Sequence, residues 1–153
     1  MATEHEQNLV KDEYMKLQQI LEDFDGKALT IKAWSVTLSA AGIVTAYAQT
    51  KKEILLIAGV SAIIFWLTEA LWKTIQQGFY ERIYAIEKWF QNDSASFPPF
   101  QIALSWRTSW QKKGQSLYVL YVMTWPHVAI PHVVVALSAF GCYLWIPPLA
   151  PSP

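Results

Sequence analysis

The sequence has few charges and almost no cysteine, and both shortages narrow what the chain can be. Charged residues make up 16% of its 153 residues, whereas an average soluble chain has about 25%. The single cysteine, Cys142, cannot form an intrachain disulfide. Hydrophobic residues reach 53% and aromatic residues 14%. The chain has about the length of one ordinary domain, so we expect a single domain without a separate catalytic domain. Its apolar composition favours a membrane protein.

Net charge is also absent, because the Lys and Arg residues number 12 and so do the Asp and Glu residues. A balanced chain gives no reason to expect nucleic-acid binding. The two signs are nevertheless separated along the chain. Acidic residues crowd the N-terminal segment and none follows Asp93, while no charged side chain follows Lys113. An acidic N-terminus does not fit a cleavable signal peptide, so we expect the first apolar segment to remain in the mature protein.

Three long apolar segments stand out against this background. Residues 28–50, 54–72 and 128–146 are each close to the roughly 20 residues that a membrane-spanning helix requires. Lys32 lies near the start of the first span, where its ammonium group can snorkel toward lipid headgroups. Only a short polar stretch separates the first two spans, so we expect them to form a tight hairpin. The sequence therefore predicts an all-α, polytopic membrane protein.

The segments that flank the hairpin, residues 1–27 and 73–92, have a helical pattern of their own. Apolar residues recur there at alternating spacings of four and three. These residues are Val10, Tyr14, Leu17, Leu21, Phe24 and Ala28 in the first flank, and Phe79, Ile83, Ile86 and Phe90 in the second. Two such seams can cover each other when the helices run antiparallel. We therefore expect a long helical hairpin that extends into the cytoplasm, within a single domain over residues 1–153.

A different kind of segment joins this hairpin to the third span. Turn-forming residues from Asn92 to Pro99 end the second flank, and residues 97–125 that follow are basic and aromatic. The candidates for a membrane interface are Trp106, Arg107, Trp110, Lys112 and Lys113. They suit the headgroup region of an anionic inner leaflet, and packing of the tryptophans against the hairpin is the equal alternative. Insertion of residues 117–125 into the bilayer is left open.

Positive charges set the expected orientation. With the N-terminus in the cytoplasm, every Lys and Arg except Lys51 and Lys52 lies on the cytoplasmic side. The C-terminus is then periplasmic or extracellular. We expect the chain to lie in a bacterial inner membrane, with the lipid bilayer as its first partner.

Glu69 is the only charged residue in the second span, and an ionisable group in that position is costly unless it has a partner or faces a cavity. Lys73 follows it by one helical turn. We expect these two side chains to form an ion pair in the inner headgroup zone. A proton or ion pathway is the alternative.

His127 and His132 each follow a proline in the third span. Their spacing of five, with no cysteine or carboxylate nearby in the sequence, does not fit a zinc site, so no metal and no cofactor are predicted. We expect each ring either to hydrogen-bond a backbone carbonyl that a proline has freed or to act as a pH-sensitive element.

The first span also has a strip of small residues, formed by Ser35, Ser39, Gly42 and Ala46. In lipid, such strips let helix backbones approach closely. The sequence contains neither a Gly-x-Ser-x-Gly elbow nor a phosphate-binding glycine loop. No catalytic residue is therefore predicted, and we do not expect an enzyme.

The segments Asp25 to Gly42 (DGKALTIKAWSVTLSAAG) and Phe79 to Glu87 (FYERIYAIE) resemble small bacterial membrane proteins of uncharacterised function. The element order over roughly the first 90 residues also resembles SLATT-type proteins, a two-helix membrane family associated with bacterial conflict systems. That resemblance implies a membrane-perturbing effector, although the third span departs from the two-helix layout.

The seam, the strip and the resemblance together predict a homo-oligomeric, non-enzymatic inner-membrane protein, as a pore-forming or membrane-disrupting effector of antiphage defence. The alternative is an accessory membrane subunit or tether that docks a soluble protein through its cytoplasmic helices.

Overall fold

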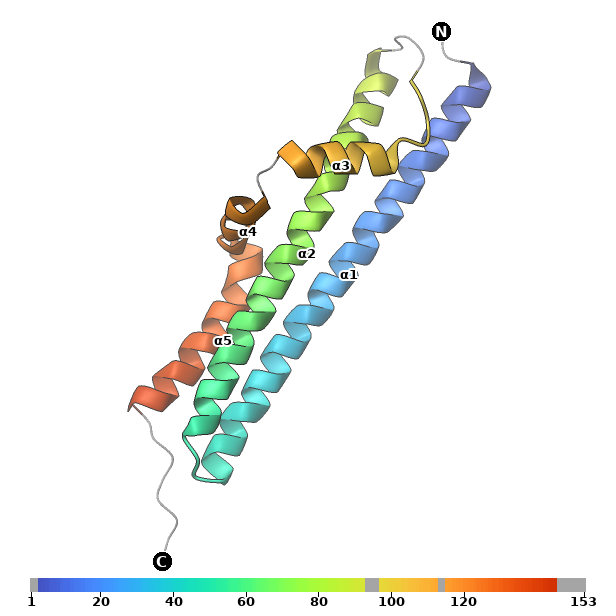
Figure 1. The fold of residues 1–153 in the computed structure, drawn as a ribbon. Coiled ribbons are helices and arrows are strands. Elements are labelled where there is room, and N and C mark those ends of the chain that lie inside the picture. Colours follow the sequence, from blue (N-terminus) through green and yellow to red (C-terminus); the bar gives the residue numbers. More distant parts are fainter. Residues whose placement is uncertain (1–2, 93–96, 113–114, 146–153) are drawn as a thin grey trace, which may run out of the picture. The chain divides into compact units, whose positions relative to one another are not determined.

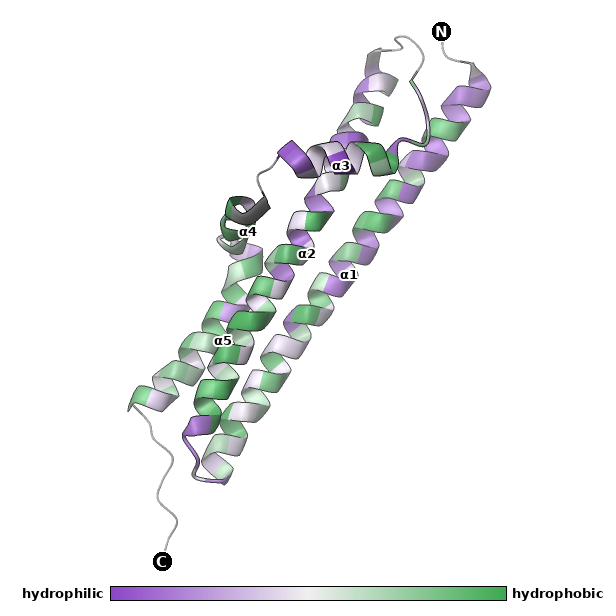
Figure 2. Ribbon diagram, in the orientation of Figure 1, coloured by the Kyte–Doolittle hydropathy of each residue, from purple (hydrophilic) through white to green (hydrophobic). Residues whose placement is uncertain are grey.

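The computed structural model describes residues 3–92, 97–112 and 115–145. These residues form five helices and no strand, which confirms the all-α prediction (Figure 1). The helices are α1 (Glu4–Ala48), α2 (Glu53–Asn92), α3 (Ile102–Lys112), α4 (Gln115–Met123) and α5 (Pro126–Trp145). Of the helices described, α1, α2 and α5 are long and apolar enough to cross a membrane. Hydrophobic residues dominate α5, the second half of α1 and the first half of α2 (Figure 2).

The chain divides into two compact units, and α1 and α2 each contribute to both. Unit 1 contains Met1–Lys27 and Trp72–Val119, and unit 2 contains Ala28–Leu71 and Leu120–Pro153. The borders within α1 and α2 fall beside the borders that the sequence predicts between the flanks and the spans. A single domain over residues 1–153 stays a prediction.

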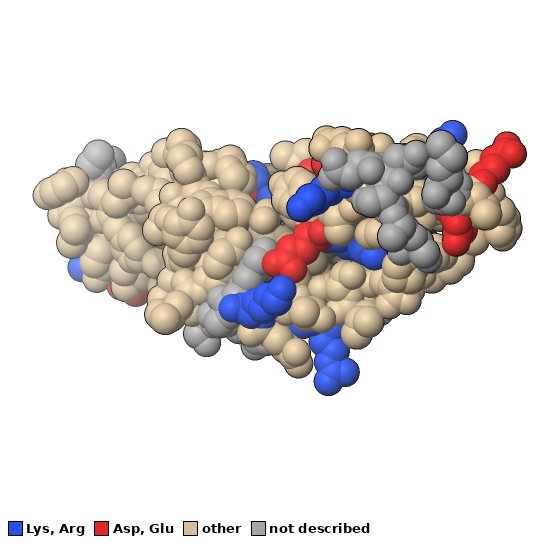
Figure 3. Space-filling view, turned by 90° about the horizontal axis from the view of Figure 1, so that it is seen from above, with Lys and Arg blue, Asp and Glu red and all other residues tan. Residues whose placement is uncertain are grey.

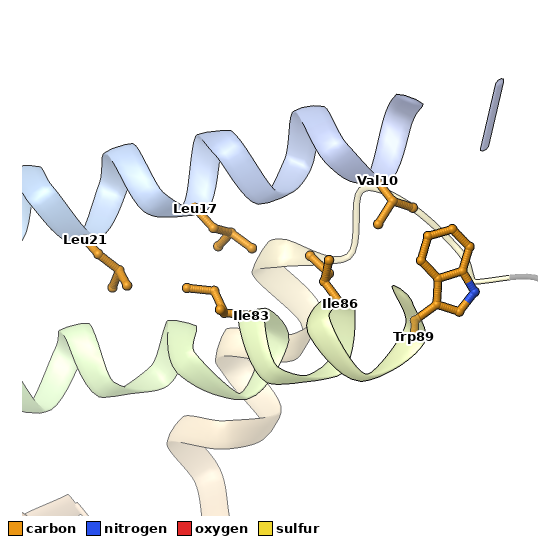
Figure 4. Close-up of a cluster of buried hydrophobic side chains, with 6 residues drawn as sticks. All are labelled: Val10, Leu17, Leu21, Ile83, Ile86 and Trp89. Atoms are coloured by element: carbon orange, nitrogen blue, oxygen red, sulfur yellow. The ribbon is translucent and has the colours of Figure 1, made fainter. Parts of the chain in front are cut away.

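Unit 1 is held together by the two apolar seams expected from the spacing, except that Trp89 is buried in place of the predicted Phe90, which is 50% exposed. Val10, Leu17 and Leu21 of α1 pack against Ile83, Ile86 and Trp89 of α2, and all six side chains are buried (Figure 4). Full burial of one such aliphatic side chain stabilises a fold by about 1.5–3 kcal/mol. The alternation of three and four residues brings one side chain per turn to the same helix face, so the seam remains continuous.

Unit 2 packs α1 against α2 through small residues. Ser35, Ser39 and Ala46 are fully buried, and the Ser39 hydroxyl donates a hydrogen bond to the Ala58 carbonyl at 3.1 Å. A Cβ atom on Gly42 would lie 2.9 Å from the Cβ of Ala58. The strip predicted for close helix contact is therefore used inside the chain.

The short connection between α1 and α2 ends α1 with a Schellman motif. The Lys51 amide donates to the Ala46 carbonyl at 3.0 Å, and the Thr50 amide donates to the Tyr47 carbonyl at 3.3 Å. This motif needs a left-handed residue after the helix, usually glycine. Here Thr50 takes that conformation, with a φ of 52°. A β-branched residue is strained there, because its side chain crowds the backbone.

Candidate functional site

Four polar side chains from all three apolar helices meet in unit 2. We call them the buried polar cluster: Lys32 and Ser35 of α1, Glu69 of α2 and His132 of α5. The Lys32 ammonium lies 2.5 Å from Glu69 Oε1, and His132 Nε2 lies 2.9 Å from Glu69 Oε2. The other ring nitrogen, His132 Nδ1, lies 2.7 Å from the Ser35 hydroxyl oxygen. Each member thus has a polar partner on another helix.

The helices bring these side chains together for local reasons. Ser35 belongs to the small-residue strip of α1, so it leaves room for a larger ring beside it. His132 directly follows Pro131, which lies inside α5 and lacks the amide that would bond the carbonyl of His127. Glu69 lies near the C-terminal end of the apolar part of α2, two residues before Leu71, where the α2 part of unit 2 ends.

Burial and charge balance explain why the cluster is tolerated. The Glu69 and His132 side chains are 0% exposed, and the Lys32 side chain is 19% exposed. An isolated buried carboxylate is strongly unfavourable, but Glu69 is offset by the Lys32 ammonium and by two hydrogen bonds. The contacts fit a neutral imidazole in which Nε2–H donates to Glu69 and Nδ1 accepts from the Ser35 hydroxyl. In this arrangement the cluster carries no net charge.

The order serine, histidine, carboxylate is also that of a nucleophilic triad, but the surroundings do not fit acyl transfer. Ser35 is fully buried within α1. Its neighbouring backbone amides are committed to helical hydrogen bonds, so they cannot form an oxyanion hole. A substrate carbonyl would have neither access nor stabilisation. The chemistry that the geometry does allow is the binding or transfer of a proton.

The ion pair predicted between Glu69 and Lys73 is not the one that forms. Glu69 pairs with Lys32, whereas Lys73 donates to Asp25 Oδ1 at 2.5 Å and to Gln76 Oε1 at 3.0 Å within unit 1. A pair one turn apart on one helix surface contributes only about 0.2–0.5 kcal/mol. Partners on neighbouring helices compete easily with so weak an interaction.

The structure separates the two histidines. His132 is fully buried in the cluster, and both of its ring nitrogens contact side chains. The predicted alternative of a hydrogen bond to a backbone carbonyl freed by a proline is therefore wrong for His132. His127 is exposed, with its ring centroid 5.5 Å from that of Trp125. A pH-sensitive role for either residue stays a prediction. Among the described residues, no three His, Cys, Asp or Glu side chains come together as a metal site would require.

The tryptophans predicted for the membrane interface have partners inside unit 1. Trp106 lies against Gly78 and donates its indole N–H to the Ile75 carbonyl at 3.0 Å. Trp110 stacks on Trp106, with 5.3 Å between ring centroids. The packing alternative therefore describes these two rings.

The basic residues of the same group lie differently. Arg107 and Lys112 are exposed on α3, and Lys113 lies outside the described residues. An interfacial role for Arg107 and Lys112 remains a prediction.

Unit 1 contains a buried ion pair that the sequence reasoning missed. Arg82 donates to both carboxylate oxygens of Glu13 at 2.9 Å, and its guanidinium also donates to the Pro98 carbonyl at 2.8 Å. The Phe100 amide donates to the same carboxylate at 2.9 Å. The position of Glu13, between Val10 and Leu17 on the apolar seam, was the feature that could have revealed it.

Comparisons with known proteins supply no template for either buried group. No protein family, no curated protein and no solved structure was found to match this chain. The role of the cluster therefore has to follow from its own residues.

Proposed function

We propose that this chain is a non-enzymatic integral membrane protein, an accessory subunit or tether that holds a helical module at the cytoplasmic face of a bacterial inner membrane. One observation carries the proposal: unit 2 buries several polar and ionisable side chains and exposes many large apolar ones. Ser35, Ser39, Glu69 and His132 are buried. Apolar side chains that are more than half exposed include Trp34, Val44, Ile57, Ile64, Val134 and Leu137. Such a surface is costly in water and suits lipid tails.

Unit 1 has the surface of a module that faces water. It has its own apolar core, while exposed acidic and basic side chains cover α1 and α2 around it. In the view of Figure 3, Lys, Arg, Asp and Glu side chains are interspersed with uncharged atoms in the middle and right parts of the surface. Positive charges favour the cytoplasmic side for this module, with the C-terminus periplasmic or extracellular.

A pore-forming or membrane-disrupting homo-oligomer of antiphage defence is the second candidate. The buried polar cluster favours it, since ionisable residues inside a predicted span often mark a functional path. However, the two features that suggested an oligomer are already used within the chain: the seam packs in unit 1, and the small-residue strip packs against Ala58. We therefore place the tether first.

Cysteine labelling tests the membrane placement. In a Cys142→Ser background, single cysteines replace Glu4 or Lys52, and intact cells are treated with a membrane-impermeant maleimide. We expect label at the Lys52→Cys position only, and at both positions after the cells are opened. Label at Glu4→Cys in intact cells, or recovery of the chain in the soluble fraction, contradicts the proposal.

Photo-crosslinking and vesicle leakage separate the two candidates. A crosslinking amino acid replaces Tyr84 in unit 1, which is 62% exposed, or Ile64 in unit 2, which is 59% exposed. A tether gives adducts with one other protein at position 84, and vesicles that contain the pure chain keep an enclosed dye. An oligomeric effector gives adducts between copies at position 64 and releases the dye.

A further inference from the structure

We propose that the buried polar cluster is a proton-binding site in which His132 takes up the proton. The inference rests on contacts within unit 2 and gives the proposed membrane protein a ligand, the proton. Only the side of the membrane from which the proton arrives depends on the proposed membrane placement.

The neutral state of the cluster has no unused hydrogen-bonding group on the imidazole. Glu69 accepts from Lys32 on one oxygen and from His132 Nε2–H on the other. His132 Nδ1 accepts the hydroxyl proton of Ser35. Both ring nitrogens are therefore held in defined roles, which leaves Nδ1 as the atom that can gain a proton.

Uptake of a proton reverses the hydrogen bond between His132 and Ser35. When Nδ1 is protonated it becomes a donor, and the Ser35 oxygen accepts from it at the same 2.7 Å. The Ser35 O–H then needs a new acceptor, and the carbonyl one turn earlier, that of Ile31, is the natural one. Among the described residues, hydroxyls that bond the carbonyl four residues before them include those of Thr68 to Ile64, Thr108 to Leu104 and Ser138 to Val134.

The Glu69 carboxylate gives the protonated ring a counter-charge. The cluster changes from no net charge to one positive charge, with the Glu69 carboxylate between the imidazolium and the Lys32 ammonium. Of the charged residues that the structure describes, Lys32 of α1 pairs with the carboxylate, and Glu69 of α2 lies beside the ring. The described part of α4 brings no charged side chain, and His127, the other titratable histidine of α5, is exposed beside Trp125.

Access to the site is one-sided. Glu69, His132 and Ser35 are fully buried, and only the Lys32 side chain is partly exposed. Protons therefore exchange on the Lys32 side, which is the cytoplasmic side in the proposed orientation. This geometry fits a site that senses the cytoplasmic proton concentration, because Lys32 is the one member of the described cluster with a partly exposed side chain.

Nitrogen NMR of the imidazoles tests the site directly. The full chain, labelled with ¹⁵N in its histidine rings, is placed in nanodiscs of phosphatidylethanolamine and phosphatidylglycerol. The exposed His5 and His127 are each replaced by Asn, so that His132 gives the only ring signals. Between about pH 8 and about pH 5 we expect these signals to change from a neutral ring protonated on Nε2 to a doubly protonated ring, with one proton gained per chain.

Two outcomes overturn the proposal: a ring that stays neutral in the folded chain across this whole range, and a ring that is doubly protonated throughout it. Glu69→Gln is the informative variant, and we expect it to lose proton uptake by His132 because the counter-charge is gone. Ser39→Ala is its control, since Ser39 is buried on the same face but bonds only the Ala58 carbonyl. Unchanged proton uptake in a folded Glu69→Gln protein contradicts the assigned role of the carboxylate.

The NMR result is independent of the labelling experiment. A ring that titrates in a chain found in the soluble fraction would overturn the proposed function and leave the proton site standing. A ring that does not titrate in a chain with the expected topology would do the reverse.

Discussion

In unit 1, leucine and isoleucine side chains fill the space between α1 and α2, whereas in unit 2 serines, glycine and alanine occupy that space. The outward faces differ in the opposite sense: charged side chains cover unit 1 and large apolar ones cover unit 2. Apolar burial stabilises packing only when the alternative is water. Where the surroundings are apolar, close contact and hydrogen bonds have to hold helices together. The same two helices therefore use two packing chemistries along their length.

The buried charges differ between the units as well. Glu13 and Arg82 in unit 1 form a closed ion pair, and both side chains also make hydrogen bonds to backbone groups. The cluster of unit 2 contains an imidazole and a hydroxyl that can exchange roles. One group fixes a structure, and the other has two states available.

Breaking the closed pair should have the largest effect. Arg82→Met leaves the Glu13 carboxylate buried without its partner, and we expect a loss of about 3–5 kcal/mol in the free energy of unfolding. Denaturation in mild detergent measures it. Lys88→Met, which removes an exposed charge from the same helix, should change stability by less than about 0.5 kcal/mol. Equal effects of the two variants would mean that the pair does not hold unit 1 together.

Two leucines of α1 compare the interior of unit 1 with the surface of unit 2. Leu17 is fully buried, and Leu38 is 46% exposed. We expect Leu17→Ala to cost about 2–5 kcal/mol and Leu38→Ala to cost less than about 0.5 kcal/mol in the same unfolding assay. A large loss for Leu38→Ala would show that this face of unit 2 packs against protein and not lipid.

Much of this contrast could be predicted from the sequence. The spacing of Val10, Leu17 and Leu21 predicts their shared face, and the lengths of the apolar segments predict the three long helices. The partners of Glu69 could not be predicted, because spacing along one helix does not reveal which residues of α1 and α5 face it. Lys32 and His132 lie 37 and 63 residues away from it in the sequence. Spacing along α2 predicted Lys73 as the partner of Glu69, whereas the partners in the structure lie on neighbouring helices.

Glycines distinguish close packing from open surface within the α1–α2 pair. A Cβ on Gly78 would lie 2.5 Å from the Trp106 ring, whereas a Cβ on Gly26 meets nothing within 4 Å. Alanine gains about 1 kcal/mol over glycine in a helix, and crowding a packed site costs about 1–3 kcal/mol. We expect Gly26→Ala to stabilise the chain and Gly78→Ala to destabilise it, with a change in Trp106 fluorescence. A stabilised Gly78→Ala protein would mean that α3 does not pack here.

Relief of strain at the hairpin should have a smaller effect, and in the opposite direction. Thr50→Gly removes the side chain from a left-handed residue, and we expect a gain of about 1 kcal/mol. Thermal unfolding in detergent measures it. Gln49→Gly is the matched control, because Gln49 has no positive φ and should gain nothing.

The smallest expected effect concerns the exposed N-terminus of α1. Thr3 and Glu6 form a capping box, in which the Thr3 amide donates to Glu6 Oε2 at 2.9 Å and the Glu6 amide donates to the Thr3 hydroxyl at 3.2 Å. The backbone hydrogen bond from Thr3 holds the pKa of Glu6 below its usual value. The stabilisation is therefore present above the unfolded pKa of about 4.5 and is lost as the pH falls through the lower folded value.

Amide hydrogen exchange measures that change. The quantity to compare is the protection factor, the intrinsic exchange rate divided by the observed rate. We expect the amides in the first turn of α1 to have lower protection factors at about pH 3 than at about pH 6. A Thr3→Ala protein, which lacks the hydroxyl partner, should show a smaller difference. Identical protection at both pH values in the unaltered chain would contradict the pKa direction.

The buried polar cluster also constrains how the chain is made. Synthesis runs from the N-terminus, so Lys32 and Glu69 are complete before His132 leaves the ribosome. If the helices enter the bilayer in that order, as the proposed placement requires, the α1–α2 hairpin inserts with its carboxylate already neutralised by Lys32. When α5 inserts, its His132 ring can bond the second carboxylate oxygen of Glu69, which is already in place. Lys32, Ser35 and Glu69 would thus form a docking site for α5 on the inserted α1–α2 hairpin.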